Sequence, residues 1–67
     1  MLKIEVELEN DGRWIGEAMA LPGVLAYGTT EAEARARVAA LALRVIADRI
    51  EHGEPIPDDV REFLAFV

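Results

Sequence analysis

The chain has 67 residues, with thirteen acidic against seven basic side chains, a formal net charge of -6 and no cysteine. A chain of this length forms at most one domain and buries only about 60% of its unfolded surface, so its core is thin. The lack of cysteine excludes disulfides, thiolate metal sites and cysteine nucleophiles. Because the charge has the wrong sign for neutralising phosphates, we expect no direct binding of nucleic acid.

The thin core and the first residues lead to two further expectations. Small domains without a disulfide are commonly stabilised by association, so we expect residues 1–67 to form a single domain that homo-oligomerises. The first five residues lack the apolar stretch of a signal peptide, and no apolar run approaches the roughly 20 residues of a membrane helix. We therefore expect a cytoplasmic protein that makes no contact with a membrane.

Residues 2–9 alternate between apolar and charged side chains, with Leu2, Ile4, Val6 and Leu8 on one face and Lys3, Glu5, Glu7 and Glu9 on the other. This alternation predicts a strand with one buried and one solvated face. Asn10-Asp11-Gly12 predicts a tight turn, after which a second strand should return antiparallel over residues 13–19.

A third strand is predicted after the corner Leu21-Pro22-Gly23. Residues 24–27 are short, apolar and bounded by glycines, as expected of a strand. The three strands together should form an antiparallel meander.

The segment Thr30-Glu31-Ala32-Glu33 has the spacing of a capping box. In that motif the Thr30 hydroxyl accepts a hydrogen bond from the amide of Glu33, and the Glu33 carboxylate accepts one from the amide of Thr30. Strong helix formers fill the following positions until Gly53, which Pro55 and Pro57 follow. The sequence therefore predicts a helix over residues 31–52.

The apolar residues of this helix fall into two stripes. The first contains Ala34, Val38, Leu41 and Val45, and the second contains Ala39, Leu43, Ile46 and Ile50. Together they span roughly 200° of the helix, twice the roughly 100° that one sheet face covers. We therefore expect Leu43, Ile46 and Ile50 to contact a partner or another copy of the chain.

Two interpretations of residues 58–67 are open. Asp58-Asp59 could begin a second helix that runs to Phe66, whereas the segment from Phe63 to Val67 has the aromatic and β-branched residues of a strand. We favour the strand. The predicted fold is then α+β with the order β-β-β-α-β, in which a three-stranded meander is packed by one long helix.

Several residue types in the chain could in principle act as catalytic or ligand-binding groups. Carboxylates at Glu5, Glu7, Glu9, Asp11 and Glu17 could hold a divalent metal, but their alternation with apolar residues favours a solvated sheet face. The single histidine, His52, suits the end of a helix, and the chain contains no serine. The glycines are too scattered for a phosphate loop, and the helical arginines lie among acids, which makes a nucleic-acid helix the weaker interpretation. We expect no enzymatic activity, no cofactor and no metal.

The two large aromatic residues before the C-terminal segment, Trp14 and Tyr27, flank the Leu21-Pro22-Gly23 corner. Burial against the helix is the simpler explanation for them. Contact with a partner is the alternative, because Trp and Tyr are enriched at binding hot spots.

The order of these motifs resembles the HicB family of antitoxins over nearly the whole chain. The similarity is carried by Asp11-Gly12-Arg13-Trp14 at a strand start, Leu21-Pro22-Gly23, Gly28, Thr30 and Glu33-Ala34. Four positions differ from the family's usual residues: Met19, Ala20, Val24 and Thr29.

The resemblance implies a partial RNase H-like domain that acts by binding. Such a domain pairs with HicA, a small basic ribonuclease toxin, neutralises it and self-associates. The family's separate DNA-binding segment has no counterpart in residues 1–67, so the resemblance is to a short, stand-alone domain. A solitary homo-oligomeric structural or regulatory protein without a toxin partner is the alternative function.

Overall fold

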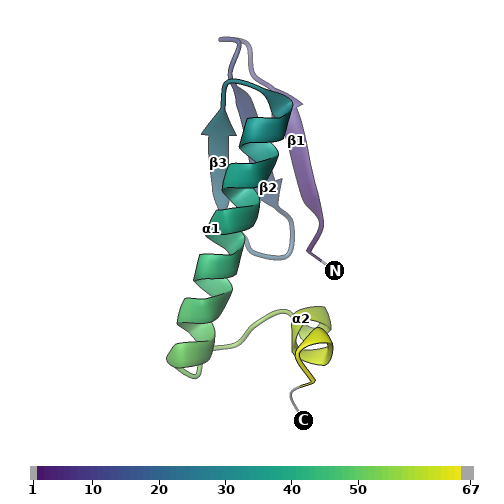
Figure 1. Ribbon diagram of the computed structural model, residues 1–67, viewed down its shortest axis with the longest axis vertical. Coiled ribbons are helices and arrows are strands. Elements are labelled where there is room, and N and C mark those ends of the chain that lie inside the picture. Colours follow the sequence, from purple (N-terminus) through teal and green to yellow (C-terminus); the bar gives the residue numbers. More distant parts are fainter. Residues whose placement is uncertain (1, 66–67) are drawn as a thin grey trace.

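The computed structural model describes residues 2–65 and combines one sheet with two helices. The elements in chain order are β1 (Ile4–Leu8), β2 (Trp14–Ala18), β3 (Leu25–Gly28), α1 (Glu31–Glu51) and α2 (Asp58–Phe63). The strands form an antiparallel sheet in the order β1-β2-β3, and α1 crosses one face of it (Figure 1). The predicted α+β class, the three-stranded meander and the long helix are confirmed.

The β1–β2 hairpin closes through the turn that the sequence predicts. The Glu9 amide donates to the Arg13 carbonyl at 2.7 Å, and Gly12, with φ of +88°, donates to the Glu9 carbonyl at 3.0 Å. The Asp11 carboxylate accepts from the Arg13 amide at 3.0 Å and from Arg13 Nε at 2.7 Å. These bonds hold the pKa of Asp11 below its ordinary value, mainly through the Arg13 amide.

The corner between β2 and β3 is part of the core. The Leu21 amide donates to the Ala18 carbonyl and the Val24 amide to the Leu21 carbonyl, both at 3.0 Å. Pro22 and Gly23 occupy the two central turn positions, and Gly23 has φ of +85°, which a type II turn requires. Leu21 and Val24 are both buried, so the corner anchors the connection between the strands.

Helix α1 lies very close to the sheet because two strand positions carry no side chain. A Cβ atom on Gly16 would lie 2.9 Å from Val38 Cγ1 and 3.0 Å from the Ala34 carbonyl oxygen. On Gly28 it would lie 2.5 Å from the Ala34 backbone nitrogen. Glycine at both positions therefore sets the distance between the first turns of α1 and the sheet.

The start of α1 matches half of the predicted capping box. The Thr30 hydroxyl accepts from the Glu33 amide at 3.0 Å, as expected. The reciprocal bond is different: Glu33 Oε1 accepts from the amide of Thr29, at 2.8 Å, instead of that of Thr30. The Arg37 guanidinium lies 3.4 Å from the same oxygen. The bond from the Thr29 amide is the main cause that lowers the pKa of Glu33, and Arg37 adds to it.

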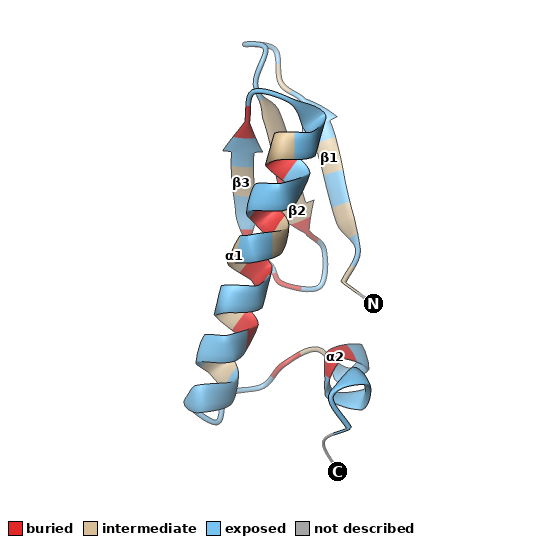
Figure 2. Cartoon of the chain, in the orientation of Figure 1, coloured by how far each residue is buried: buried red, intermediate tan, exposed pale blue. Residues whose placement is uncertain are grey.

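The buried row of α1 takes residues from both predicted stripes. It contains Ala34 and Val38 of the first stripe, Ile46 of the second and Ala42 between them, spaced four residues apart (Figure 2). Leu41 and Val45 of the first stripe are partly buried beside this row, whereas Leu43 of the second is exposed. The first stripe therefore faces the core, and the second is divided between Ile46 in the core and Leu43 on the surface.

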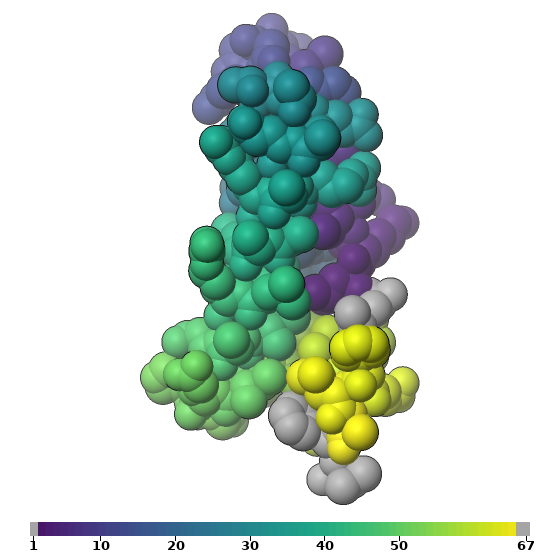
Figure 3. All heavy atoms as spheres, viewed as in Figure 1, coloured from purple at the N-terminus to yellow at the C-terminus, as the bar shows by residue number. Residues whose placement is uncertain are grey.

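Helix α1 is longer than the sheet that it covers. Its 21 residues span about 31 Å at 1.5 Å per residue, whereas the four or five residues of each strand span about 14–17 Å. The molecule is accordingly elongated, with extents of 44 × 19 × 16 Å (Figure 3). Ile56 and Val60 from the C-terminal segment join Ile46 in the core cluster beyond the sheet.

The structure does not confirm the C-terminal strand. Asp58–Phe63 forms helix α2 instead, Leu64 caps it, and Ala65 has φ of +57°. Pro57 precedes the first turn of α2, and the two aspartates in that turn stabilise the positive, N-terminal end of the helix dipole. Val60 is buried and attaches the helix to the core. Phe63, the aromatic residue that suggested a strand, is 72% exposed. The last two residues of the predicted strand, 66 and 67, lie outside the described residues.

Candidate protein-binding surface

The two faces of the sheet differ in what covers them. Helix α1 contacts all three strands on one face, and α2 contacts none of them. Because strand side chains alternate between faces and Gly16 and Gly28 lie under α1, the neighbouring odd-numbered positions point the other way. No element within residues 2–65 covers that second face. We define the outer face by its central side chains, Glu5, Glu7, Ile15, Glu17, Leu25 and Tyr27.

The register of the strands brings apolar and acidic side chains together on the outer face. Ile15 is opposite Glu7 on one side and Tyr27 on the other. Glu17 is opposite Glu5 and Leu25 in the same way. Like charges directly opposite each other destabilise a sheet, so the Glu5–Glu17 pair has an energetic cost, which the pairing of Glu5 with Lys3 offsets only in part.

The basic residues near the outer face lie at its ends. Lys3 Nζ is 3.4 Å from Glu5 Oε2, and both side chains are largely exposed. The Arg13 guanidinium carbon is 4.2 Å from the centre of the Tyr27 ring, which is a cation–π contact. The Arg13 guanidinium also binds Asp11, so Arg13 does not neutralise the charge of Glu7 or Glu17.

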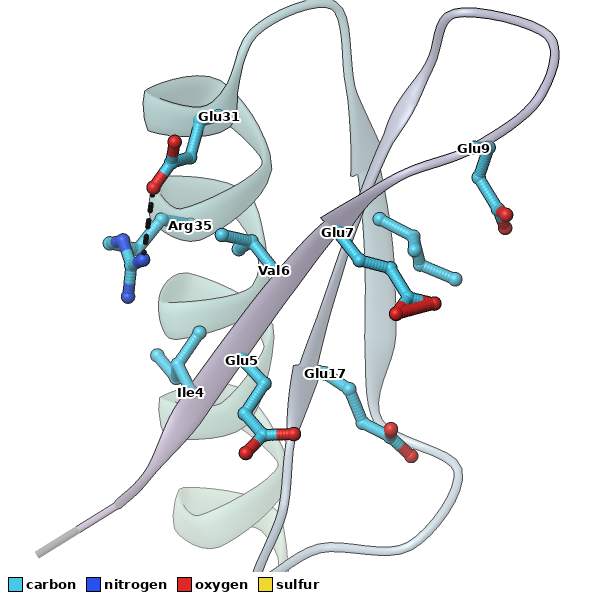
Figure 4. Close-up of a pocket in the computed structure, with 9 residues that line it drawn as sticks. Ile4, Glu5, Val6, Glu7, Glu9, Glu17, Glu31 and Arg35 are labelled. Atoms are coloured by element: carbon cyan, nitrogen blue, oxygen red, sulfur yellow. Dashed lines mark hydrogen bonds and ion pairs between the residues drawn. The ribbon is translucent and has the colours of Figure 1, made fainter.

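A hollow of about 460 Å³ follows the free side of β1. Ile4 and Val6 point toward α1, whereas Glu5, Glu7 and Glu17 point to the opposite face of the sheet (Figure 4). Glu31 and Arg35 of α1 line the hollow beside Ile4 and Val6, and their side chains pair at 3.4 Å. The lining carries five glutamates against one arginine, so the hollow is strongly acidic.

The backbone groups at the two sheet edges differ in availability. The Met19 amide donates to the Lys3 carbonyl at 2.9 Å and the Glu9 amide to the Arg13 carbonyl at 2.7 Å. Antiparallel pairing alternates, so the odd positions of β1 bond to β2, and the amides and carbonyls of Ile4, Val6 and Leu8 point away from the sheet.

On the other edge, the Ala18 amide donates to the Val24 carbonyl at 3.0 Å, so Leu25 and Tyr27 are the β3 positions whose backbone points outward. Arg37 Nη1 donates to the Tyr27 carbonyl at 3.1 Å and so occupies one of the outward backbone groups of that edge. In the described part of the chain, β1 is therefore the more open edge.

The two aromatic candidates, Trp14 and Tyr27, do not form one site. Trp14 pairs with Gly28 and Tyr27 with Ile15, so the two rings lie on opposite faces of the sheet. Trp14 is half-buried on the side of α1, as its simpler explanation predicts, and Tyr27 is 37% exposed on the outer face. Tyr27 alone belongs to the uncovered surface.

The three helical candidates also separate. Leu43 is 62% exposed and Ile50 is 37% exposed, whereas Ile46 is only 5% exposed and packs in the core. Leu43 and Ile50 lie two turns apart on the part of α1 that continues beyond the sheet. Ile46 is part of the monomer's core, and Leu43 and Ile50 remain available for contact.

Residue type alone does not identify Ile15 and Leu25 as members of this surface. A sheet covered on only one side normally carries polar residues on the other. Residues 13–19 have no clean polar face, and this is the feature of the sequence that indicates apolar residues on the outer face. Within residues 2–65, no three acidic or histidine side chains are close enough to hold a metal ion. The single histidine lies at the end of α1, where its Nδ1 is 2.7 Å from the Asp48 carbonyl.

Comparisons of the chain with protein-family models, curated proteins and solved structures found no significant match. None of the helices within residues 2–65 has both the length and the apolar character needed to cross a membrane.

Proposed function

We propose that this chain is a non-enzymatic protein-binding module whose outer sheet face binds a small basic protein. The observation that carries this proposal is the combination of Ile15, Leu25 and Tyr27 with the opposed Glu5–Glu17 pair on an uncovered face. Apolar and aromatic groups supply contact area, and carboxylates supply complementarity to a basic surface. A partner that brings cations to this face would also relieve the repulsion between the two glutamates.

The resemblance to HicB antitoxins gives the class of partner. We propose a small basic HicA-like ribonuclease toxin, which this chain would neutralise by occupying its RNA-binding surface. In this proposal the sheet and α1 correspond to the first four elements of the family's partial RNase H-like domain. The net charge of -6 would attract a basic toxin over a distance of several ångströms and speed their association.

The test is co-expression of the full chain with the small basic protein encoded beside its gene. The proposal expects a complex of fixed stoichiometry and suppression of RNA cleavage by the toxin. A toxin whose activity is unchanged at saturating concentrations of this chain would contradict it. A gene without any such neighbour would favour the alternative below.

The alternative is a solitary homo-oligomer with a structural or regulatory role. Leu43, Ile50, Phe63 and Leu64 are exposed on the part of the molecule that lies beyond the sheet. The largest fully buried side chains are only Leu21 and Val38, so the monomer's core is small. A stable oligomer in light scattering, with no binding of a basic protein, would support this function instead.

A further inference from the structure

We infer that the free edge of β1 binds an extended basic segment of the partner, which adds to the sheet as a fourth strand. This inference rests on the proposed binding of a basic protein and specifies how the partner is held. An exposed edge presents unpaired amides and carbonyls, and strand addition satisfies them with main-chain hydrogen bonds.

The edge of β1 has the geometry that strand addition needs. The amides and carbonyls of Ile4, Val6 and Leu8 point away from β2, because the odd positions carry the bonds to it. The hollow of about 460 Å³ along this side leaves room beside Ile4 and Val6. On the edge of β3, Arg37 already occupies the outward carbonyl of Tyr27, so the two edges are not equivalent.

Charge disfavours a second copy of the chain as the occupant of this edge. An antiparallel pair of β1 strands centred on Val6 would place Glu5 of one copy opposite Glu7 of the other, and a pair centred on Glu7 would place Glu7 opposite Glu7. A pair centred on Glu5 would place Glu5 opposite Glu5, with Lys3 opposite Glu7 on either side. Like charges directly opposite destabilise a sheet, and each of these registers contains at least one such pair, whereas a basic strand contains none.

The same side chains define the chemistry of the strand that does fit. On one face it meets Ile4 and Val6, which are half-buried against α1, and on the other it meets the carboxylates of Glu5 and Glu7 (Figure 4). Strand side chains alternate between faces. The occupant is therefore a segment in which apolar residues alternate with lysine or arginine.

The probe is a fluorescent nine-residue peptide of alternating lysine and valine, with blocked ends, titrated into the full chain. A peptide of alternating glutamate and valine is the matched control and should bind at least about tenfold more weakly. Two further peptides carry N-methyl groups on every valine or on every lysine. Only one set of amides can face β1, so one methylated peptide should bind like the parent and the other about tenfold more weakly.

Amide exchange measured by NMR locates the peptide on the chain. The amides of Ile4, Val6 and Leu8 should exchange rapidly in the free chain and become protected when the peptide binds. Those of Glu5 and Glu7 should be protected in both states, because they bond to β2. Leu8→Pro should abolish protection at this end of β1, because proline has no amide hydrogen. Leu8→Ala keeps the amide hydrogen and changes a side chain that is 57% exposed, so it should leave the protection unchanged.

Three results would overturn the inference. They are equal binding of both methylated peptides, protection confined to β3, and protection of β1 that appears with rising chain concentration alone. If the basic toxin binds without protecting Ile4, Val6 and Leu8, the inference fails and the proposed function stands. If the peptide binds as expected and no toxin does, the strand site stands and the proposed function fails.

Discussion

Arg37 Nη1 donates a hydrogen bond to the backbone carbonyl of Tyr27 at 3.1 Å, across ten residues of the chain. The same guanidinium pairs with Glu33, which accepts from the Thr29 amide at the start of α1. One arginine thus joins the helix start to the outward edge of β3. Natural sheets commonly protect an open edge, and this bond makes the β3 edge less open than that of β1.

Replacing Arg37 should show how much its bond to the Tyr27 carbonyl contributes to the free energy of unfolding. We expect Arg37→Met to lower the free energy of unfolding by about 0.5–1.5 kcal/mol, the net contribution of a typical hydrogen bond, because the Arg37 side chain is largely exposed to solvent. Arg35→Met is the matched control, because Arg35 pairs only with exposed Glu31 and should lose at most about 0.5 kcal/mol. Urea denaturation of both variants checks the difference. Equal losses would show that the bond to Tyr27 adds nothing.

The glycines under α1 make a prediction about packing. Gly28→Ala should destabilise the fold by about 1–3 kcal/mol, because the new Cβ would meet only backbone atoms of α1. Gly16→Ala should also destabilise it, but its nearest atom is Val38 Cγ1. In a Val38→Ala background, Gly16→Ala should therefore cost less than alone, whereas the cost of Gly28→Ala should not change. A double-mutant cycle by denaturation tests this, and identical couplings for the two glycines would refute it.

Glu33 predicts part of the acid sensitivity of the fold. Its pKa in the folded chain lies below the ordinary value of 4.5, chiefly because of the hydrogen bond from the Thr29 amide. A lowered folded pKa means that Glu33 stabilises the fold above about pH 4.5 and that this contribution disappears as the pH falls through the folded pKa. The stability curves of wild type and Glu33→Gln should therefore separate above that pH and converge in acid. Curves that stay parallel from pH 2 to about pH 7 would contradict this account.

Substitutions at Leu43 and Ile46 distinguish a surface position that could form an interface from a core position. Ile46→Glu should unfold the chain, because it buries a charge at a position that is 5% exposed. Leu43→Glu should leave a folded protein, since Leu43 is 62% exposed. If α1 mediates self-association, light scattering of Leu43→Glu should give a smaller particle than wild type. An unfolded Leu43→Glu variant would show that this residue supports the core.

The features that the sequence predicts well depend on neighbouring residues. The hairpin turn needs only Asp11, Gly12 and the flanking alternation, and the helix start needs only Thr30 and Glu33. These contacts span four residues or fewer, so local patterns determine them. The bond between Glu33 and the Thr29 amide differs from the prediction by one residue, which is a small change in the same turn.

The features that the sequence misses depend on register and on the distance between layers. Whether Trp14 and Tyr27 share a face follows from the pairing of Trp14 with Gly28, and no local pattern determines that pairing. The buried row of α1 follows from the close approach at Gly16. Periodicity instead favours the larger residues Leu43 and Leu41.

The C-terminal segment and the binding surface illustrate the same limit. Phe63 suits a strand by its type, but the segment forms a helix in which Val60 is buried in the core and Phe63 is exposed. Ile15 looks like a core residue until the register places it opposite Glu7 and Tyr27 on the uncovered face.

Calorimetry of charge-reversal variants tests the proposed binding of a small basic protein to the acidic outer face. The titrant is the small basic ribonuclease that we propose as the partner, and the variants are Glu7→Lys on the outer face and Glu62→Lys on α2, which change the charge equally. We expect at least about tenfold weaker binding for Glu7→Lys and wild-type affinity for Glu62→Lys. Equal affinities for the two variants, or no binding by the wild-type chain, would contradict it.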